Sequence, residues 1–378
     1  MSDPATHADD AGFMARALEL AARGLYSTSP NPHVGCVLVR DGVIVGEGFH
    51  ETPGQAHAEV LAIRAAGEFA RGATAYVTLE PCNHFGKTPP CVNALIDAGV
   101  ARVVAAMRDP NPIAAGGAER LRAAGIAIDF GLLAADAHEL NIGWLHRLQH
   151  GRPWFRMKVA ASLDGRTALA DGRSHWITGE AARADGHHWR ARACCVLTGI
   201  GTVRDDDPRL TVRAVPTPRQ PLRVLVDSRL EVPLDAKILQ GGQVLVACAI
   251  DDPARAQRLV DRGAEVLMLP NASAKVDLAQ LAHELGRRGW NEVHVEAGHK
   301  LNGSLLAAGL VDEIVTYFAP KLIGTSGQGM FDLPAPASLD AARVVAIRDV
   351  LRIGPDLRVT ARVVNTVVHS GHIADTAR

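Results

Sequence analysis

The spacing of apolar and polar residues along the first half of the chain switches repeatedly between the period of helices and that of strands. Apolar residues recur at helical intervals over 13–23, and this pattern stops at Gly24. Two strand-like runs, 34–40 and 43–49, flank Asp41-Gly42, which predicts a hairpin. The pattern then predicts strands over 74–79, 102–107 and 126–130, and helices over 57–66, 89–98, 117–124 and 134–148. Strands that alternate with helices predict an α/β fold with an α/β/α layered sheet.

A second alternating series begins after His150-Gly151-Arg152-Pro153, a polar junction between two predicted domains. Its predicted strands cover 154–161, 194–198, 222–227, 243–249, 266–269, 292–296, 313–318 and two segments near the C-terminus, and its predicted helices cover 180–193, 253–262, 278–287 and 302–308. The expected organisation is a disordered N-terminus over 1–10, a first domain over 11–150, a second domain over 151–368 and a tail over 369–378.

Composition narrows the classes of function. With 378 residues, of which 47% are hydrophobic, the chain has material for two cores. A net charge of -1 argues against nucleic acid as a partner, and no apolar run is long enough to span a membrane. The N-terminus lacks the form of a signal peptide, and six cysteines in so long a chain do not make a disulfide framework. We therefore expect a cytoplasmic protein that acts on a small molecule.

The strongest chemical signal is a set of residues in three segments: His57-Ala58-Glu59, Pro81-Cys82 and Cys91. One imidazole and two thiolates bind zinc and leave its fourth position open for water, as catalytic zinc sites do. Glu59 is free to move protons as a general acid and base. His-x-Glu followed by Pro-Cys and a second Cys is the zinc-deaminase signature, so the sequence predicts one zinc ion per chain and hydrolytic removal of an amino group.

The spacing of the two cysteines departs from the general signature, which has two residues between them. Here Cys82 and Cys91 are separated by Asn-His-Phe-Gly-Lys-Thr-Pro-Pro. Taken singly, each cysteine is also explained as a small buried core residue. His57 and Cys91 are both expected to start helices, where the backbone dipole favours thiolate over thiol.

Several motifs together resemble one family, the riboflavin-biosynthesis bifunctional deaminase–reductases. In the first half they are Ser29-Pro-Asn-Pro-His-Val-Gly35, Thr78-Leu-Glu-Pro-Cys82 with the insert ending Thr-Pro-Pro-Cys91, and Asp109-Pro-Asn-Pro112. In the second half they are Lys158-Val-Ala-Ala-Ser-Leu-Asp-Gly-Arg-Thr167, Ser174-His-Trp-Ile-Thr178, Gly201-Thr-Val-Arg-Asp-Asp-Asp-Pro208, Leu210-Thr-Val-Arg213, Val226-Asp-Ser228 and Gly309-Leu-Val-Asp-Glu313. The resemblance extends over residues 12–365.

The resemblance implies two consecutive reactions on a phosphorylated pyrimidine. The first is zinc-dependent deamination of 2,5-diamino-6-(5-phosphoribosylamino)pyrimidin-4(3H)-one. The second is reduction of the ribosyl side chain by NADPH, which gives 5-amino-6-(5-phosphoribitylamino)uracil. It also implies a cytidine-deaminase-like N-terminal domain, a dihydrofolate-reductase-like C-terminal domain and a homo-oligomer, either a dimer or a tetramer.

Three more residues are candidates for the first site. Asn31 lies between two prolines and is expected to hydrogen-bond the substrate, although a turn residue is the alternative. His84 is expected to face the substrate or support a ligand, against a simple loop position. Lys87 can bind the substrate's phosphate or carbonyl group, and a solvent-exposed lysine without a role is the alternative. After Asp109-Pro-Asn-Pro112 the segment 113–118 is one residue shorter than the family pattern, so no substrate contact is assigned there.

The second half carries no Gly-x-Gly-x-x-Gly fingerprint after its first strand, so NADPH rests on the resemblance. The resemblance implies cofactor contacts at Ala161, Trp176, Thr202, Asp206, Ser228, Gly298, Leu301, Gly303 and Ser304. It implies substrate contacts at Ser174, Arg190, Leu210, Arg213 and Glu296. The segment 298–304 follows a predicted strand and opens a predicted helix, where backbone N–H groups can bind phosphate; an ordinary turn is the alternative.

Charge and polarity suggest roles for these side chains. Arg190 and Arg213 are suited to the ribose phosphate, with ordinary surface arginines as the alternative. Glu296 can accept pyrimidine N–H groups. Lys158 interrupts an apolar strand, which is unfavourable unless it faces a cleft, so we expect it to position the ribose or assist its opening to an imine. Asp206 is the second candidate for proton transfer, with a helix cap as its alternative.

Two other functions compete with this interpretation. A deaminase of cytidine, guanine or tRNA adenosine would need neither a second α/β domain nor the long insert between the cysteines. A zinc-stabilised scaffold would be expected to supply four protein ligands, and no fourth ligand is evident. Removal of zinc separates catalysis from scaffolding, because a structural ion is required for folding.

Overall fold

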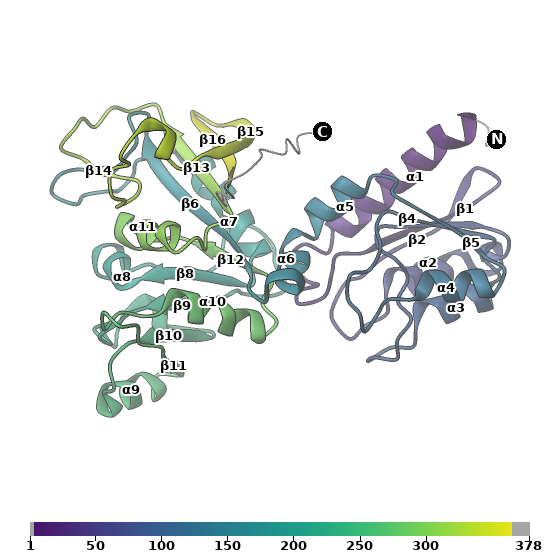
Figure 1. The fold of residues 1–378 in the computed structure, drawn as a ribbon, viewed down its shortest axis with the longest axis horizontal. Helices are drawn as coiled ribbons and strands as arrows, with labels where there is room; N and C mark the ends of the chain where they lie inside the picture. Colours follow the sequence, from purple (N-terminus) through teal and green to yellow (C-terminus); the bar gives the residue numbers. More distant parts are fainter. Residues whose placement is uncertain (1–3, 365–378) are drawn as a thin grey trace.

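The computed structural model describes residues 4–364 and has two lobes, each built on its own sheet (Figure 1). The first lobe contains β1 (Gly35–Arg40), β2 (Val43–Phe49), β3 (Thr74–Val77), β4 (Arg102–Ala105) and β5 (Ala127–Phe130), in the order β2-β1-β3-β4-β5. β1 is antiparallel to β2 and β3, and β3, β4 and β5 are parallel. Its helices are α1 (Pro4–Ala22), α2 (Ala58–Ala66), α3 (Cys91–Ala98), α4 (Gly117–Ala123), α5 (Ala134–Leu140) and α6 (Ile142–His150), with a 3₁₀ turn, η1 (Gly67–Ala70).

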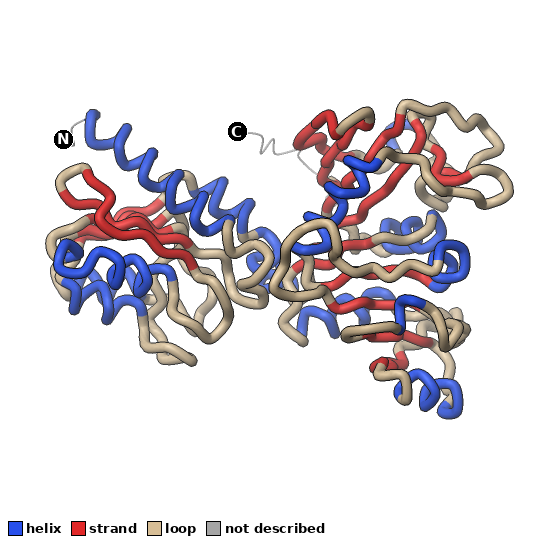
Figure 2. Tube along the Cα trace, turned by 180° about the vertical axis from the view of Figure 1, so that it is seen from behind, coloured by secondary structure: helices blue, strands red, loops and turns tan. Residues whose placement is uncertain are grey.

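Strand alternation divides the side chains of this sheet between two cores. Cys36 and Leu38 of β1 face the core shared with α2, α3 and α4, whereas Val37 and Val39 face α1 and α5. Successive side chains of a strand point to opposite faces, so a sheet with two apolar faces needs helices on both. Figure 2 shows α1 and α5 on one side of the sheet and α2, α3 and α4 on the opposite side. The predicted α/β/α layering is confirmed.

Two helices of the first lobe differ from the prediction. α1 begins at Pro4, inside the segment for which the sequence predicts disorder, because proline is tolerated in a first helical turn and buried Asp10 anchors the helix by accepting hydrogen bonds from Tyr76 and Arg102. The single helix expected over 134–148 is divided at Asn141, whose buried side chain bonds both the N–H and the carbonyl of His33. Both differences depend on contacts between distant segments.

The second lobe is a sheet in the order β11-β10-β9-β8-β12-β6-β13-β16-β15 with a small two-stranded sheet, β14-β7. Its strands are β6 (Trp154–Ser162), β7 (Arg166–Ala168), β8 (Cys195–Gly199), β9 (Leu222–Val226), β10 (Val244–Cys248), β11 (Ala264–Met268), β12 (Glu292–Val295), β13 (Glu313–Ala319), β14 (Gln328–Gly329), β15 (Val345–Ile353) and β16 (Asp356–Val363). Its helices are α7 (Glu180–Arg192), α8 (Ile200–Asp206), α9 (Pro253–Val260), α10 (Leu278–Arg287) and α11 (His299–Ala307), with 3₁₀ turns η2 (Lys237–Leu239) and η3 (Leu339–Ala341).

This sheet is parallel from β11 to β13, and β16 and β15 continue it as an antiparallel hairpin. Two cores cover its faces: Cys195 and Leu197 of β8 enter one, and Val196 enters the other. The sequence prediction missed α8, a short helix that the last residue of β8 caps, and the two short strands β7 and β14. The predicted tail over 369–378 lies outside the described residues.

The two lobes meet through a few polar contacts beside the chain connection from α6 to β6 (Figure 1). Arg147 of α6 donates to Asn291 at 2.7 Å, and Asn291 donates to the carbonyl of Pro30 at 3.0 Å. Arg362 of β16 donates to Glu139 of α5 at 2.6 and 2.7 Å. Asn291, directly before β12, therefore contacts two segments of the first lobe, and β16 contacts a third.

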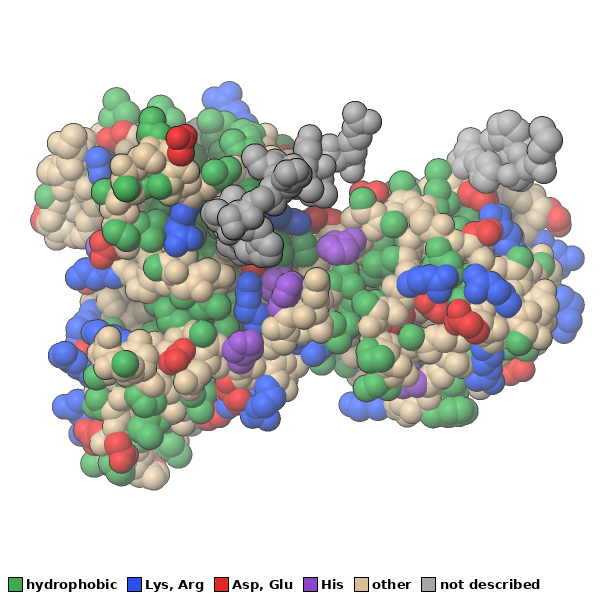
Figure 3. Space-filling model, in the orientation of Figure 1, with side chains coloured by type: hydrophobic (Ala, Val, Ile, Leu, Met, Phe, Trp, Pro, Cys, Tyr) green, Lys and Arg blue, Asp and Glu red, His purple; other side chains and the backbone are tan. Residues whose placement is uncertain are grey.

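The visible face of the molecule has no large region in which all charged side chains carry the same sign. Figure 3 shows Lys and Arg interspersed with Asp and Glu over both lobes, in keeping with the net charge of -1. Within residues 4–364, no helix has the length and apolar character required to cross a membrane.

Candidate active sites

Three segments of the first lobe deliver the predicted metal ligands to one point. His57 caps the N-terminus of α2, Cys82 follows β3, and Cys91 is the first residue of α3. Glycines in β2 let α2 approach closely: a Cβ on Gly48 would lie 2.5 Å from the carbonyl oxygen of Ala58. The expectation that both the His57 and Cys91 segments start helices is confirmed.

The geometry of the three ligand atoms fits zinc. Nδ1 of His57 lies 3.2 Å from Sγ of Cys91 and 3.5 Å from Sγ of Cys82, and all three atoms lie within 4.8 Å of one another. Zinc–nitrogen bonds of about 2.0 Å and zinc–sulfur bonds of about 2.3 Å at tetrahedral angles place nitrogen and sulfur about 3.5 Å apart. Nε2 of His57 lies 3.4 Å from the Thr88 hydroxyl, which fixes the ring orientation. The donor set and its spacing therefore match a zinc site with three protein ligands.

The two thiols differ in how readily each loses its proton. The hydrogen bond from Cys91, together with those from His57 and the backbone N–H of Cys91, lowers the pKa of Cys82. The same hydrogen bond and burial raise the pKa of Cys91. A thiolate at Cys82 is the form that binds a metal ion.

Glu59 is the second residue of α2, two positions after His57. It lines the same cavity as the three ligands, and this cavity has a volume of about 500 Å³. Its side chain is 3% exposed, and burial followed by the nearby Cys82 thiolate raises its pKa to about 7. A carboxyl group with a pKa near neutrality both accepts and returns protons. The structure thus gives Glu59 the surroundings of a general acid and base.

Glu80 ties together the loops around the ligands. Its carboxylate accepts from the backbone N–H of Asp109 at 3.2 Å and of Ala118 at 2.9 Å. Gly117 is required beside it, because a Cβ there would lie 1.9 Å from the carbonyl oxygen of Pro81. The segment 113–118, which sequence alone does not place, closes on the metal ligands: the carbonyl of Ala114 accepts from the N–H of Asn83 at 2.9 Å.

Asn31 faces the cavity and is oriented by a histidine. His50 is 3% exposed, and its Nδ1 lies 3.3 Å from the carbonyl oxygen of Ala56, so Nδ1 carries the proton. Nε2 of His50 therefore accepts from the side-chain amide of Asn31, at 3.0 Å. This bond engages the Asn31 nitrogen and leaves its carbonyl oxygen available to accept from an amino group.

The insert between the cysteines forms another wall of this cavity. His84, Lys87 and Thr88 all line it, with Lys87 exposed to solvent. Nδ1 of His84 is buried without a hydrogen-bond partner among residues 4–364. Within residues 4–364, His84 makes no hydrogen bond to the metal ligands, so we describe it as a residue of the cavity wall.

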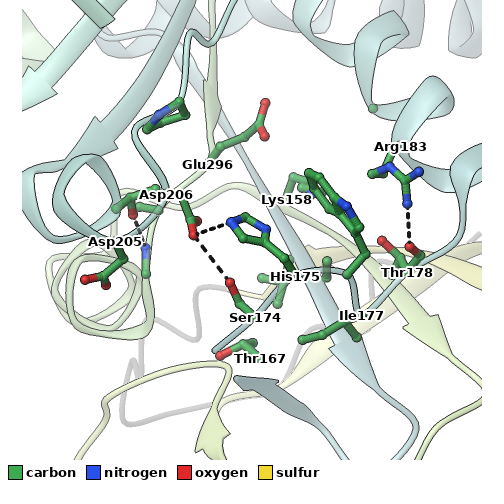
Figure 4. Close-up of a pocket in the computed structure, with 18 of the residues that line it drawn as sticks. Lys158, Thr167, Ser174, His175, Ile177, Thr178, Arg183, Asp205, Asp206 and Glu296 are labelled. Carbon is green, nitrogen blue, oxygen red and sulfur yellow. Dashed lines mark hydrogen bonds and ion pairs between the residues drawn. The ribbon is translucent and has the colours of Figure 1, made fainter. Parts of the chain in front are cut away.

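The second lobe has a larger cavity, of about 890 Å³, between β6, α7, α8 and the start of α11 (Figure 4). The predicted site residues that line it are Lys158, Ser174, Trp176, Arg190, Thr202, Asp206, Leu210, Arg213, Glu296 and Gly298. Sequence-distant strands and helices therefore converge on one hollow.

Arg190 and Glu296, expected to contact substrate separately, bind each other in this cavity. Nη2 of Arg190 lies 2.9 Å from Oε2 of Glu296, and its Nε donates to Oε1. Nη1 of Arg190 donates to the carbonyl of Thr211 at 3.1 Å. In this arrangement the guanidinium charge is already neutralised, whereas Arg209 and Arg213, which also line the cavity, are exposed.

Asp206 and Lys158 lie in different surroundings. Asp206 accepts from Ser174 at 3.4 Å and forms an ion pair with Nε2 of His175 at 3.0 Å (Figure 4). Lys158 makes no hydrogen bond or ion pair with any residue that the structure describes, and burial lowers its pKa although Glu296 opposes the shift. Its ammonium group is therefore available to a ligand.

The predicted cofactor residues do not all reach the cavity. Trp176, Thr202 and Gly298 line it, and the hydroxyl of Thr202 accepts from the N–H of Gly298 at 3.1 Å. Those absent from the lining are Ala161, Ser228, Leu301, Gly303 and Ser304. Gly303 has a packing role, because a Cβ there would lie 2.0 Å from the carbonyl oxygen of Asp332.

Sequence reasoning missed several residues of both cavities. In the first, Trp144, Arg147 and Gly289 were not predicted, and no local motif marks them. In the second, His175 and His187 line the cavity. His175 stands next to Ser174 in a motif that carried the resemblance, so its position was the available signal.

Comparison with known proteins identifies the chain. The model of the RibD C-terminal domain matches residues 153–357, and that of the cytidine and deoxycytidylate deaminase zinc-binding region matches residues 7–107. RibD from Escherichia coli strain K12 is 47% identical over 362 residues, covering 92% of this chain and 98% of that protein. The chain belongs to the RibD family. Haemophilus influenzae RibD is 45% identical, covering 93% of this chain and 96% of that protein.

Solved RibD structures have the same fold. The structure of Acinetobacter baumannii RibD superimposes with a TM-score of 0.87 at 44% identity, covering 94% of this chain and 99% of that one. A Thermotoga maritima structure, described as a diaminohydroxyphosphoribosylaminopyrimidine deaminase/5-amino-6-(5-phosphoribosylamino)uracil reductase, gives 0.85 at 32% identity and covers 95% and 100%. As a RibD protein, this chain is a bifunctional deaminase and reductase of riboflavin biosynthesis, and the predicted fold class and family are confirmed.

Proposed function

We propose that the chain hydrolyses 2,5-diamino-6-(5-phosphoribosylamino)pyrimidin-4(3H)-one at its first site and reduces the ribosyl group of the product at its second. The observation that carries the proposal is the cluster of His57, Cys82 and Cys91 with buried Glu59 in one cavity. RibD membership supplies the substrate class. We assign the first activity to residues 11–150 and the second to 151–368.

Zinc fits the first site. His57 would hold it through Nδ1, and Cys82 and Cys91 through their sulfur atoms. When bound, zinc supplies a Lewis acid that lowers the pKa of a coordinated water towards 7. Thr88 orients the imidazole through its other nitrogen.

The protein's own groups move the protons of deamination. A carboxylate oxygen of Glu59 takes a proton from water and delivers it to the departing amino nitrogen, so that water and the aminopyrimidine give the pyrimidinedione and ammonia. Asn31 holds the pyrimidine through its free carbonyl oxygen, because His50 engages its nitrogen. Burial of Glu59 keeps its proton transfer out of bulk water.

The second cavity fits a nicotinamide dinucleotide beside a sugar phosphate. α11 begins at the cavity wall with Gly298 as its N-cap, so backbone N–H groups of its first turn are available to a phosphate. When bound, NADPH supplies the hydride that adds to C1 of the ribose. Arg213, exposed at the cavity, is placed to bind the substrate's phosphate.

We propose that Lys158 binds the ribose of the substrate and that Asp206 orients other side chains of the cavity wall. Lys158 has an unpaired ammonium group on β6 and can donate to the ribose oxygen that is released when the ring opens. Asp206 instead engages Ser174 and His175 (Figure 4). These contacts fix the positions of the His175 imidazole and the Ser174 hydroxyl in the cavity wall.

One experiment tests both reactions. Purified protein is incubated with the diaminopyrimidine substrate, with and without NADPH, and the products are analysed by mass. Exchange of NH for O without NADPH, followed by a gain of two hydrogens with it, supports the proposal. No mass change in zinc-replete protein would refute the deaminase step, and no gain of hydrogens would refute the reductase step.

We also propose a homo-oligomer, a dimer or tetramer, in the cytoplasm. The β15–β16 hairpin lies at the sheet edge and exposes Ile347 (64%) and Val350 (53%), which a second copy would cover. Thiolate metal ligands require reducing surroundings. Light scattering measures the mass of the assembly, and cell fractionation tests the location.

A further inference from the structure

Arg147 lines the deaminase cavity together with a residue of the second lobe. It lies on α6, three residues after Trp144, so both side chains share one face of that helix and line the cavity together. Gly289, from the loop before β12 in the second lobe, lines it as well. The cavity that contains the metal ligands is therefore completed by residues from outside the deaminase sheet.

A single neutral partner holds the guanidinium of Arg147. Its Nε donates to Oδ1 of Asn291 at 2.7 Å. Asn291 is 4% exposed, and its Nδ2 donates to the carbonyl of Pro30 at 3.0 Å, so its amide is fixed between the two lobes. Pro30 is next to Asn31, the residue assigned to the pyrimidine. Asn291 thus sets the direction in which Arg147 points.

The charge of Arg147 has no counter-ion within residues 4–364. Its Nη1 and Nη2 have no hydrogen-bond partner there, although the side chain is half-buried. The buried arginines nearby are paired: Arg192 and Arg156 both bind Glu292. Burial lowers the pKa of Arg147, with Cys194 opposing the shift, and a partly buried cation without an anion beside it is unfavourable.

We propose that Arg147 binds the phosphate of the pyrimidine substrate during deamination, with Asn291 as its positioning residue; this rests on the proposed function. With Nε occupied, the guanidinium presents two parallel N–H donors, which match two oxygens of a phosphate. The acidic groups of the cavity are otherwise engaged or buried: Glu80 accepts two backbone N–H groups. Substrate choice at the deaminase site then depends on a residue that the reductase lobe holds in place.

The test compares two substrates in steady-state deamination without NADPH: the phosphorylated diaminopyrimidine and its dephosphorylated form. Arg147→Ala is expected to raise KM for the phosphorylated substrate by about 10- to 150-fold, the range for hydrogen bonds to charged groups, with kcat nearly unchanged. The KM of the dephosphorylated substrate should not change. Arg147→Lys, which keeps the charge and loses the fork, should raise KM by less, and Asn291→Ala should raise KM without lowering kcat.

Arg122→Ala is the matched control, since Arg122 is an exposed arginine on α4 that pairs with Glu119. Zinc content and reductase activity report that each variant folds. An equal loss for both substrates in Arg147→Ala, or no loss for either, overturns the proposal. The proposal is also overturned if Lys87→Ala loses the preference for the phosphorylated substrate while Arg147→Ala keeps it. The phosphate would then bind the segment between Cys82 and Cys91.

Failure of the proposed function gives a different result. If the wild-type protein deaminates neither substrate, the assignment of the reaction is wrong, and the anion site is tested by calorimetry with ribose 5-phosphate. Loss of one binding event in Arg147→Ala relative to the wild type supports the site. Identical titrations of the two proteins overturn it.

Discussion

Arg190 and Glu296 form a two-bond ion pair in the reductase cavity, with Nη2 of the arginine 2.9 Å from Oε2 of the glutamate. The arginine comes from α7 and the glutamate follows β12, so the pair joins two elements of the cavity wall. Both side chains are largely buried, at 16% and 14% exposed. A substrate that contacts either one therefore meets a neutral pair rather than a free charge.

Breaking this pair is expected to impair reduction alone. Glu296→Gln keeps the shape and leaves Arg190 buried without a counter-ion, which should lower the reductase kcat/KM by about 10- to 100-fold. Deamination should remain within twofold of the wild type. Steady-state kinetics of both steps measures this, with Glu231→Gln, from an exposed pair with Arg204, as the control. An unchanged reductase rate would show that the pair is only structural.

Replacement of a thiolate ligand is expected to remove the metal. Cys91→Ser should lose zinc and deamination, because a serine hydroxyl is a poor zinc ligand, while reduction of the deaminated intermediate continues. Elemental analysis and the two assays measure this. Cys248→Ala, a buried cysteine in the other lobe, is the control. Stoichiometric zinc with full deamination in Cys91→Ser would contradict the assigned ligands.

Glu59, beside the metal ligands, is expected to transfer protons rather than to bind the metal. Glu59→Gln should lower the rate of deamination by about 10²- to 10⁴-fold, the usual contribution of general acid–base catalysis, and retain zinc. Glu119→Gln, exposed on α4, should keep the full rate. If zinc is lost with the activity, Glu59 instead supports the metal.

A methyl group at Gly117 is expected to disturb the metal site by displacing the segment that carries Cys82. In Gly117→Ala, Cβ would lie 1.9 Å from the carbonyl oxygen of Pro81, so the Cys82 segment must shift. Overpacking of this kind costs about 1–3 kcal/mol. Denaturant unfolding and zinc affinity should both show the loss, whereas Gly12→Ala, with open space around its Cβ, should not. Unaltered zinc affinity in Gly117→Ala would mean that the segment moves freely.

The buried ion pairs of the second lobe predict a pH dependence of stability. Burial opposes ionisation of Glu292, but Arg192 and Arg156 prevail and lower its pKa from 4.5 to about 2. The unfolded chain therefore binds the proton first as the pH falls, so the stabilisation is complete above pH 4.5 and is lost towards pH 2.

Glu292→Gln removes this contribution. It should lower the free energy of unfolding by about 3–5 kcal/mol at pH 7, because Arg192 loses its carboxylate partner and Arg156 keeps only Glu313. Urea unfolding of both proteins between pH 7 and pH 3 measures the difference, which should shrink at the acid end. A difference that stays constant over this range would contradict the assigned pKa.

Much of the architecture could be predicted because it depends on neighbours in the sequence. The bounds of β2 and α10 match their predicted ranges, since alternation and helical spacing are properties of a few consecutive residues. α8 was missed because seven residues carry too little periodicity. The three metal ligands were found because each sits in a short motif whose residue types suit one metal.

The sequence by itself determined the alternation of helices and strands, the likeness to one family and the set of groups that can hold zinc. Only the tertiary structure decided that Asn141 divides a helix, that Arg190 pairs with Glu296, and that Asn291 directs Arg147 into the deaminase cavity. These contacts join residues far apart in the chain. Their geometry depends on how whole elements pack, which no local pattern of apolar and polar residues specifies.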